Sequence, residues 1–126
     1  YEIGVRLVGS EMCIRDRVKA IHKMIRSSPQ KVNLIVKDIR RKKISEAINI
    51  LKFSQKRVSS EVLKTLNSAV ANAENNNNLD IDKLIVKEVY VGKSIRLKRY
   101  NPQSKGRAHK IIKPYSRVTV ILEESA

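Results

Sequence analysis

"KSIRLKRYNPQSKGRAHKIIKPYSR", residues 93–117, contains nine Lys or Arg residues and not one Asp or Glu. The segments on either side, "KLIVKEVYVGK" and "SRVTVILEE", are rich in Val, Ile or Tyr and are predicted to be β-strands. Sharp turn chemistry between them is confined to "YNPQSKG". We therefore predict a β-hairpin whose base joins a sheet and whose tip lies near Pro102 to Gly106.

This basic ribbon is too long to be covered by its own domain. At about 3.3 Å per residue, the chain from Lys93 to Gln103 extends roughly 30 Å beyond the sheet. A two-stranded ribbon alone in water is marginally stable, so another molecule is expected to supply the missing partner surface. Nine cations without an acid indicate that this surface carries phosphate groups.

A solvated basic surface without a partner is the simpler alternative. Such surfaces normally mix both signs of charge, whereas the run of 34 residues from Val89 to Leu122 contains no acid, although the chain has 12. Apolar and aromatic residues also separate the charges. Tyr100 and Tyr115 are each as compatible with packing inside the ribbon as with stacking on a base or ribose.

Composition narrows the class of partner. The chain has 126 residues, and 27 Lys and Arg against 12 Asp and Glu give a net charge of +15 and a pI near 10.3. Nucleic acid is the first candidate partner and an anionic membrane surface the second. No window approaches eighteen uncharged apolar residues, which argues against a membrane-spanning helix. The single Cys13 can form neither an internal disulfide nor a zinc site by itself, which fits a reducing compartment.

Residues 1–17, "YEIGVRLVGSEMCIRDR", differ from the rest in charge. Their three acids balance their three bases, so the whole net charge belongs to residues 18–126. The segment begins with Tyr1 rather than Met and shows no signal-peptide pattern. We expect it to be an extension, disordered or artefactual, that is foreign to the domain formed by residues 18–126.

One strand and three helices are predicted before the ribbon. "VKAIHKMIR", residues 18–26, has the alternation of a half-exposed strand. "SSPQKVNLIVKDIRRKK" predicts a helix that begins at its Ser and Pro residues and has the basic quartet 40–43 as its last turn. Its buried stripe is predicted to be Val32, Ile35, Val36 and Ile39. "ISEAINILKFS" predicts a second helix. The third and longest is expected to run from near Ser54 to the "NNNN" of residues 75–78.

Together these elements predict an α+β fold. A small three-stranded antiparallel sheet packs on three helices, and a long basic β-hairpin, residues 91–118, protrudes from it. The third helix places Val62, Leu66 and Ala69 on one face, where they are expected to enter the core.

Nothing in the pattern indicates an enzyme. His22 and His109 stand among lysines rather than beside a carboxylate, and no Ser-His-Asp or Cys-His arrangement can be assigned. Asp80 and Asp82 resemble a turn more than a metal site, which would need further oxygen ligands. We predict no catalytic residue, no metal and no cofactor.

An architectural DNA-bending protein is the strongest alternative from another class. Such proteins also extend basic β-arms and insert a proline between base steps, a role that Pro102 would suit. The Lys and Arg residues of this ribbon are instead spread along its whole length. Such a distribution is expected for insertion into a polyanionic mass rather than for wrapping one groove. A third alternative is a small basic enzyme that acts on nucleic acid. It would need an acid cluster or a positioned His, and neither can be identified in the sequence.

Residues 19–124 resemble the family of bacterial large-subunit ribosomal protein twenty-two. The resemblance rests on "SPQK" in the first helix, "SAVANAENNNNLD" at the end of the third, "LKRYNPQSKGRAHKI" in the ribbon and "VTVILEE" near the C-terminus. Several linked motifs in the same order make chance agreement improbable. The chain departs from many relatives at Gln30 and Asn33, where they carry bases.

The resemblance implies a structural constituent of the large ribosomal subunit, located in the cytoplasm, that binds large-subunit ribosomal RNA and supports subunit assembly. Its hairpin would run inward through the RNA, and the tip would line the peptide exit tunnel. The implied partners are this RNA, neighbouring ribosomal proteins including large-subunit protein four at the tunnel constriction, and the nascent polypeptide. No membrane partner is implied.

The same resemblance assigns residues to two roles. By position, the tunnel-lining tip corresponds to Lys98, Arg99, Tyr100, Pro102, Lys105, Gly106 and Arg107. The residues expected to bind ribosomal RNA are Lys23, Arg26, Lys31, Arg40, Arg41, Lys42, Lys43, Lys93, Arg96, Lys98, Arg99, Lys105, Arg107, His109, Lys110, Lys113 and Arg117. Arginines of the ribbon rank above its lysines, because a guanidinium bonds phosphate bidentately and stacks on bases.

Overall fold

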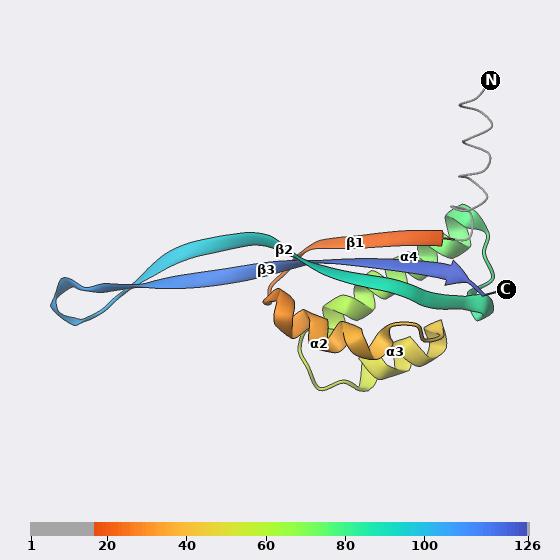
Figure 1. Cartoon of the computed structure of the whole chain (residues 1–126), viewed down its shortest axis with the longest axis horizontal. Coiled ribbons are helices and arrows are strands. Elements are labelled where there is room, and N and C mark those ends of the chain that lie inside the picture. Colours follow the sequence, from red (N-terminus) through yellow and green to blue (C-terminus); the bar gives the residue numbers. More distant parts are fainter. Residues whose placement is uncertain (1–16, 126) are drawn as a thin grey trace, which may run out of the picture.

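The computed structural model describes residues 17–125, which form one three-stranded antiparallel sheet and three helices (Figure 1). The main elements are β1 (Arg17–Ile25), α2 (Pro29–Ile39), α3 (Ile44–Phe53), α4 (Ser59–Asn77), β2 (Leu84–Pro102) and β3 (Ala108–Glu124). Two short 3-10 turns complete the chain: η1 (Ile81–Lys83) precedes β2, and η2 (Ser104–Gly106) joins β2 to β3. The predicted α+β fold class is confirmed, and the long hairpin is β2–β3.

The sheet buries one face against the helices. β3 is the central strand, with β1 on one side and β2 on the other. Val18, Leu122 and Val86 form one paired row across all three strands, and each is at most 4% exposed. Side chains alternate between the faces of a strand, so the intervening positions point away from the core. The helices therefore cover a single face of the sheet.

Each helix contributes an apolar stripe to the same core. A fully buried Leu or Ile side chain contributes about 1.5–3 kcal/mol through removal from water. The predicted stripe of the first helix and the predicted face of the third are confirmed. The buried helical residues are Val32, Ile35, Val36 and Ile39 of α2, Ile44, Ala47 and Leu51 of α3, and Val62, Leu66, Ala69 and Ala73 of α4.

Strand β2 carries one extra residue relative to β3 at two places. The first irregularity lies between Val86 and Glu88 and the second between Lys93 and Arg96. An extra residue shifts the alternation of side chains and bends the strand. The first bulge therefore lets Val86 and Val89 both enter the core although they are three residues apart. The second lies where the hairpin leaves the sheet.

The hairpin formed by β2 and β3 continues far beyond the end of β1. β1 ends at Ile25, which pairs with Ser116 of β3, and Lys93 of β2 pairs with Ser116 from the other side. Past this row β2 and β3 have only each other, and the ribbon extends away from the helices (Figure 1). We call residues 94–115 the arm. Residues 98–113 are all exposed, and η2 forms the tip at the predicted position.

The predicted end of the first helix is wrong. α2 ends at Ile39, and the basic quartet 40–43 does not form a helical turn. Arg41 has a φ of 62°, its N–H donates to the Val86 carbonyl at 2.8 Å, and the Val86 N–H donates to the Lys42 carbonyl at 2.9 Å. Backbone pairing with the outer edge of β2 is therefore favoured over another helical turn.

The start and the end of α4 can be compared with the predicted third helix. α4 begins at Ser59 rather than near Ser54, and residues 54–58 connect it to α3. The Asn run does end α4: Asn78 is left-handed, with a φ of 52°, and its N–H donates to the Ala73 carbonyl. The predicted extension, residues 1–17, lies outside the described residues except for Arg17, the first residue of β1.

Candidate nucleic-acid interface

Lys and Arg residues of the arm are paired across the ribbon with neutral residues. Like charges directly opposite each other destabilise a strand pair, so this register lets a dense positive charge coexist with pairing. Apolar side chains such as Ile111 and Ile112 occupy the facing positions. The pairs are Arg96–Pro114, Leu97–Lys113, Lys98–Ile112, Arg99–Ile111 and Tyr100–Lys110.

The cations point to both faces of the arm. Consecutive residues of a strand face opposite sides, so Lys98 and Arg99 project in opposite directions. Lys113 shares the face of Arg99, and Lys110 shares the face of Lys98, because of their places in the register. A protein that binds one groove needs cations on one face only. This arm is suited to a polyanion that surrounds it.

The charged groups of the arm form no ion pair with any acid of residues 17–125. Among residues 17–125, the ion pairs within 4 Å involve Lys42, Lys64, Lys87 and His22, none of which lies in the arm. The Arg99 guanidinium donates only to the carbonyl of its neighbour Lys98, at 2.9 Å. These cations therefore keep donors for an external anion.

A tight turn closes the tip. Lys105 and Gly106 are both left-handed, with φ of 60° and 71°. The Gln103 N–H donates to the Arg107 carbonyl at 2.6 Å, and the Arg107 N–H donates to the Ser104 carbonyl at 3.4 Å. All seven residues assigned to the tip are exposed, and Tyr100 is 69% exposed.

Arg26 holds the root of the arm. Its Nη1 donates to the Pro114 carbonyl at 3.1 Å, and its guanidinium carbon lies 5.5 Å from the centre of the Tyr115 ring. The Pro114 carbonyl faces Arg26 instead of β2. The backbone nitrogen and carbonyl of a strand residue lie on the same edge of the strand, so the missing N–H of this proline removes no hydrogen bond to β2. Tyr115, which is half-buried, therefore packs at the root, whereas Tyr100 remains free for stacking.

The quartet 40–43 divides into bound and free cations. The Arg40 guanidinium donates from Nε and Nη2 to the Val89 carbonyl, at 3.2 and 3.0 Å, and also to Asn33 Oδ1 at 3.0 Å. Lys42 pairs with Glu46 at 3.1 Å. Arg41 and Lys43 are exposed. Arg40 thus supports the edge of β2, and the exposed cations are the better placed for an external partner.

A third group of cations surrounds the start of α2. The predicted residues Lys23, Arg26 and Lys31 are all exposed there. Arg57, which the sequence reasoning missed, joins them from the connection between α3 and α4, and its Nη2 donates to the Arg26 carbonyl at 3.1 Å. The contact joins residues 31 positions apart, so the sequence near Arg57 could not predict it. The only local sign of a basic site was the position of Arg57 beside Lys56 in a short linker.

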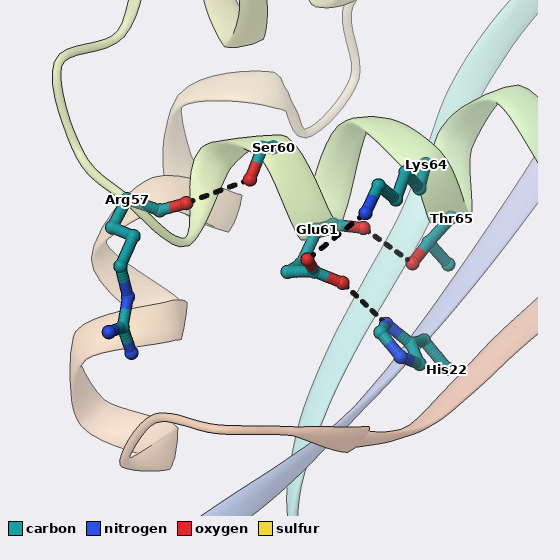
Figure 2. A network of polar contacts seen from close by, with 6 residues as sticks. All are labelled: His22, Arg57, Ser60, Glu61, Lys64 and Thr65. Carbon is teal, nitrogen blue, oxygen red and sulfur yellow. Dashed lines mark hydrogen bonds and ion pairs between the residues drawn. The ribbon is translucent and has the colours of Figure 1, made fainter.

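His22 does have a carboxylate nearby, contrary to the interpretation of its sequence neighbours. Its Nδ1 lies 3.9 Å from Glu61 Oε2, and Lys64 Nζ lies 3.3 Å from Glu61 Oε1 (Figure 2). In the same view the Arg57 side chain points away from this carboxylate, while Ser60 donates to the Arg57 carbonyl. The pair joins β1 to α4, and the Thr65 hydroxyl beside it donates to the Glu61 carbonyl at 3.0 Å.

The described part of the chain offers neither a metal cluster nor a membrane-spanning helix. Residues 17–125 contain no group of three His, Cys, Asp or Glu side chains that could hold a metal ion. None of the helices described there is long and apolar enough to cross a membrane.

The sequence matches known proteins along most of its length. Residues 20–123 match the family model described as "Ribosomal protein L22p/L17e". The chain is 56% identical over 110 residues to "Large ribosomal subunit protein uL22" of Pelagibacter ubique, covering 87% of this chain and 83% of that protein. The proteins of the same name from Methylobacterium nodulans and Brucella abortus are each 50% identical, covering 86% and 88% of this chain and 86% of each relative.

Proposed function

The chain belongs to the ribosomal protein L22p/L17e family, and from that premise we propose that its arm is embedded in large-subunit ribosomal RNA, with the tip lining the polypeptide exit tunnel. As a member of this family it is a structural constituent of the large ribosomal subunit, which is cytoplasmic in bacteria, and it is not an enzyme.

The observation that carries the RNA proposal is the charge on both faces of an exposed ribbon. Arg96 and Arg99 project to opposite sides, and no carboxylate of residues 17–125 lies within 4 Å of either. Counterion release by phosphates on all sides would offset the cost of ordering such a ribbon. The arm therefore completes its own packing with RNA, and RNA folding around it would support subunit assembly.

The tunnel proposal rests on the family resemblance and on the shape of the arm. The tip residues, from Lys98 to Arg107, lie at the end of the arm most remote from the helices (Figure 1). A globular end that stays near the surface of the subunit could thus place its tip deep inside. Large-subunit protein four and the nascent chain are the proposed neighbours of this tip.

DNA bending remains a distinguishable alternative. A DNA-bending arm tracks one groove with one face, whereas Lys98 and Arg99 here project to opposite faces. A duplex DNA competitor that displaced ribosomal RNA from the purified protein at equal phosphate concentration would favour this alternative.

The test compares two triple variants with the same reduction in charge. R96Q/R99Q/R107Q removes the three arginine charges of the arm, and K37Q/K52Q/K83Q removes the charges of three exposed lysines of the globular part. We expect the arm variant to bind ribosomal RNA at least about tenfold more weakly and to lower the salt slope by about one for each phosphate that it no longer neutralises. Equal effects of the two variants would show general charge attraction and would overturn the arm proposal.

A further inference from the structure

A hollow lies at the root of the arm, where four segments of the chain meet. The residues that follow β1, the start of α2, the connection before α4 and the root of β3 border a half-open hollow of about 380 Å³. We call it the root pocket. Its lining contains three cations, two hydroxyl groups and no acid: Arg26, Ser27, Ser28, Lys31, Arg57 and Pro114.

Two of the three cations of the root pocket are held by hydrogen bonds to backbone carbonyls, and none of the three forms an ion pair within residues 17–125. Arg57 donates to the Arg26 carbonyl, and Arg26 donates to the Pro114 carbonyl, each at 3.1 Å. A guanidinium has five N–H donors, so most of them stay free. No carboxylate of residues 17–125 lies within 4 Å of Arg26, Lys31 or Arg57, and Glu61 faces His22 and Lys64 instead (Figure 2).

The two serines add neutral donors to the lining of the pocket. Ser27 is 8% exposed and lines the root pocket, and its carbonyl accepts from Ser116. Ser28 precedes the first turn of α2 and makes no side-chain cap bond, and that turn contains no acid. The N-terminal turn of a helix also leaves backbone N–H groups without partners. Donors and positive charge therefore converge from several elements on one volume.

We propose that the root pocket binds a single phosphate group of the RNA backbone. A tetrahedral anion can accept hydrogen bonds from guanidinium, ammonium and hydroxyl donors at once, and this pocket presents all three. Because Arg26 contacts both the pocket and the arm, this phosphate would be held where the arm leaves the sheet. The inference rests on the proposed RNA-binding function and adds a defined site to it.

The test titrates inorganic phosphate into the full chain and follows amide chemical shifts. We expect saturable shifts at Ser27, Ser28 and Lys31, and also at Tyr115, because the pocket includes the root of the arm. K31Q removes one charged donor of the pocket and should weaken phosphate binding by about threefold. The Lys31 side chain makes no hydrogen bond within residues 17–125, so the fold should not change. K37Q is the matched control, because it removes the same charge farther along α2.

A second variant and an RNA readout separate the two proposals. R57Q should weaken phosphate binding as K31Q does, whereas K56Q, which changes the neighbouring charge outside the pocket, should not. Equal effects of K31Q and K37Q, or shifts scattered over the whole basic surface, would overturn the root pocket. The proposed function would still stand in that case if R96Q/R99Q/R107Q weakened ribosomal RNA binding as expected.

Discussion

The Ser116 hydroxyl donates a hydrogen bond to the Ser27 carbonyl at 2.6 Å, and this contact is buried. It joins the central strand β3 to the segment between β1 and α2, at the row of paired residues where β1 ends. The two residues are 89 positions apart. The root of the arm is therefore fixed to the globular part by a directional contact as well as by apolar packing.

Removal of this contact should destabilise the whole domain. Ser116→Ala leaves the Ser27 carbonyl without its partner, and a buried unsatisfied acceptor costs about 1–3 kcal/mol. We expect the free energy of unfolding, measured by urea denaturation, to fall by that amount. Ser104→Ala at the exposed tip is the control and should change it by less than about 0.5 kcal/mol. Equal stability of the two variants would show that the contact carries no energy.

The arm itself should contribute little to stability. Replacing residues 99–111 with Asn-Gly joins Lys98 to Ile112, which already pair, through a two-residue hairpin turn. The deleted residues are all exposed, so the free energy of unfolding should change by less than about 1 kcal/mol. Leu122→Ala, at a fully buried site of the same hairpin, should cost about 2–5 kcal/mol in the same assay.

Local signals explain why the hairpin could be predicted. The turn needs Asn, Pro, Ser and Gly within a few residues, and the flanking strands need β-branched residues, so both features are readable without knowledge of contacts. The stripe of α2 is equally local, because Val32, Ile35 and Val36 follow the helical period. These parts of the fold were therefore predicted correctly.

Features that depend on distant contacts could not be predicted. α2 ends at Ile39 because Arg41 finds a backbone partner in Val86, and Arg40 reaches a carbonyl 49 residues further along the chain. The root pocket likewise assembles Arg26, Lys31 and Arg57 from separate segments. Composition shows only that such bases are abundant, whereas packing decides which of them meet.

Tyr90 should keep its proton to unusually high pH. Its hydroxyl donates to the Glu88 carboxylate, and this hydrogen bond is the main cause that raises the pKa of Tyr90 above the ordinary 10.0. The folded state then binds the proton more tightly than the unfolded state, so this stabilising contribution is present below pH 10 and is lost as pH rises through the folded pKa.

A titration of the tyrosine ring carbons by NMR measures this shift directly. Glu88→Gln removes the charged acceptor and should return the pKa of Tyr90 toward 10.0. A Tyr90 pKa that was unchanged by Glu88→Gln would contradict the assignment of the shift to this hydrogen bond.

The two glycines of the hairpin should respond oppositely to alanine. Gly106 has a φ of 71°, where a Cβ costs about 1 kcal/mol, although no heavy atom lies within 4 Å of the added carbon. Gly92 also has open space but lacks a positive φ, so Gly92→Ala should be neutral or stabilising by up to about 1 kcal/mol.

Because Gly106 lies in the turn at the tip, its substitution should affect the opening of that turn rather than the stability of the core. Because the tip does not contact the core, Gly106→Ala should open the turn without lowering global stability. Amide exchange at Gln103, whose N–H closes the tip, should then accelerate about fivefold, a factor that corresponds to about 1 kcal/mol. Unchanged exchange at Gln103, or a decrease in global stability, would show that the tip does not open independently of the domain.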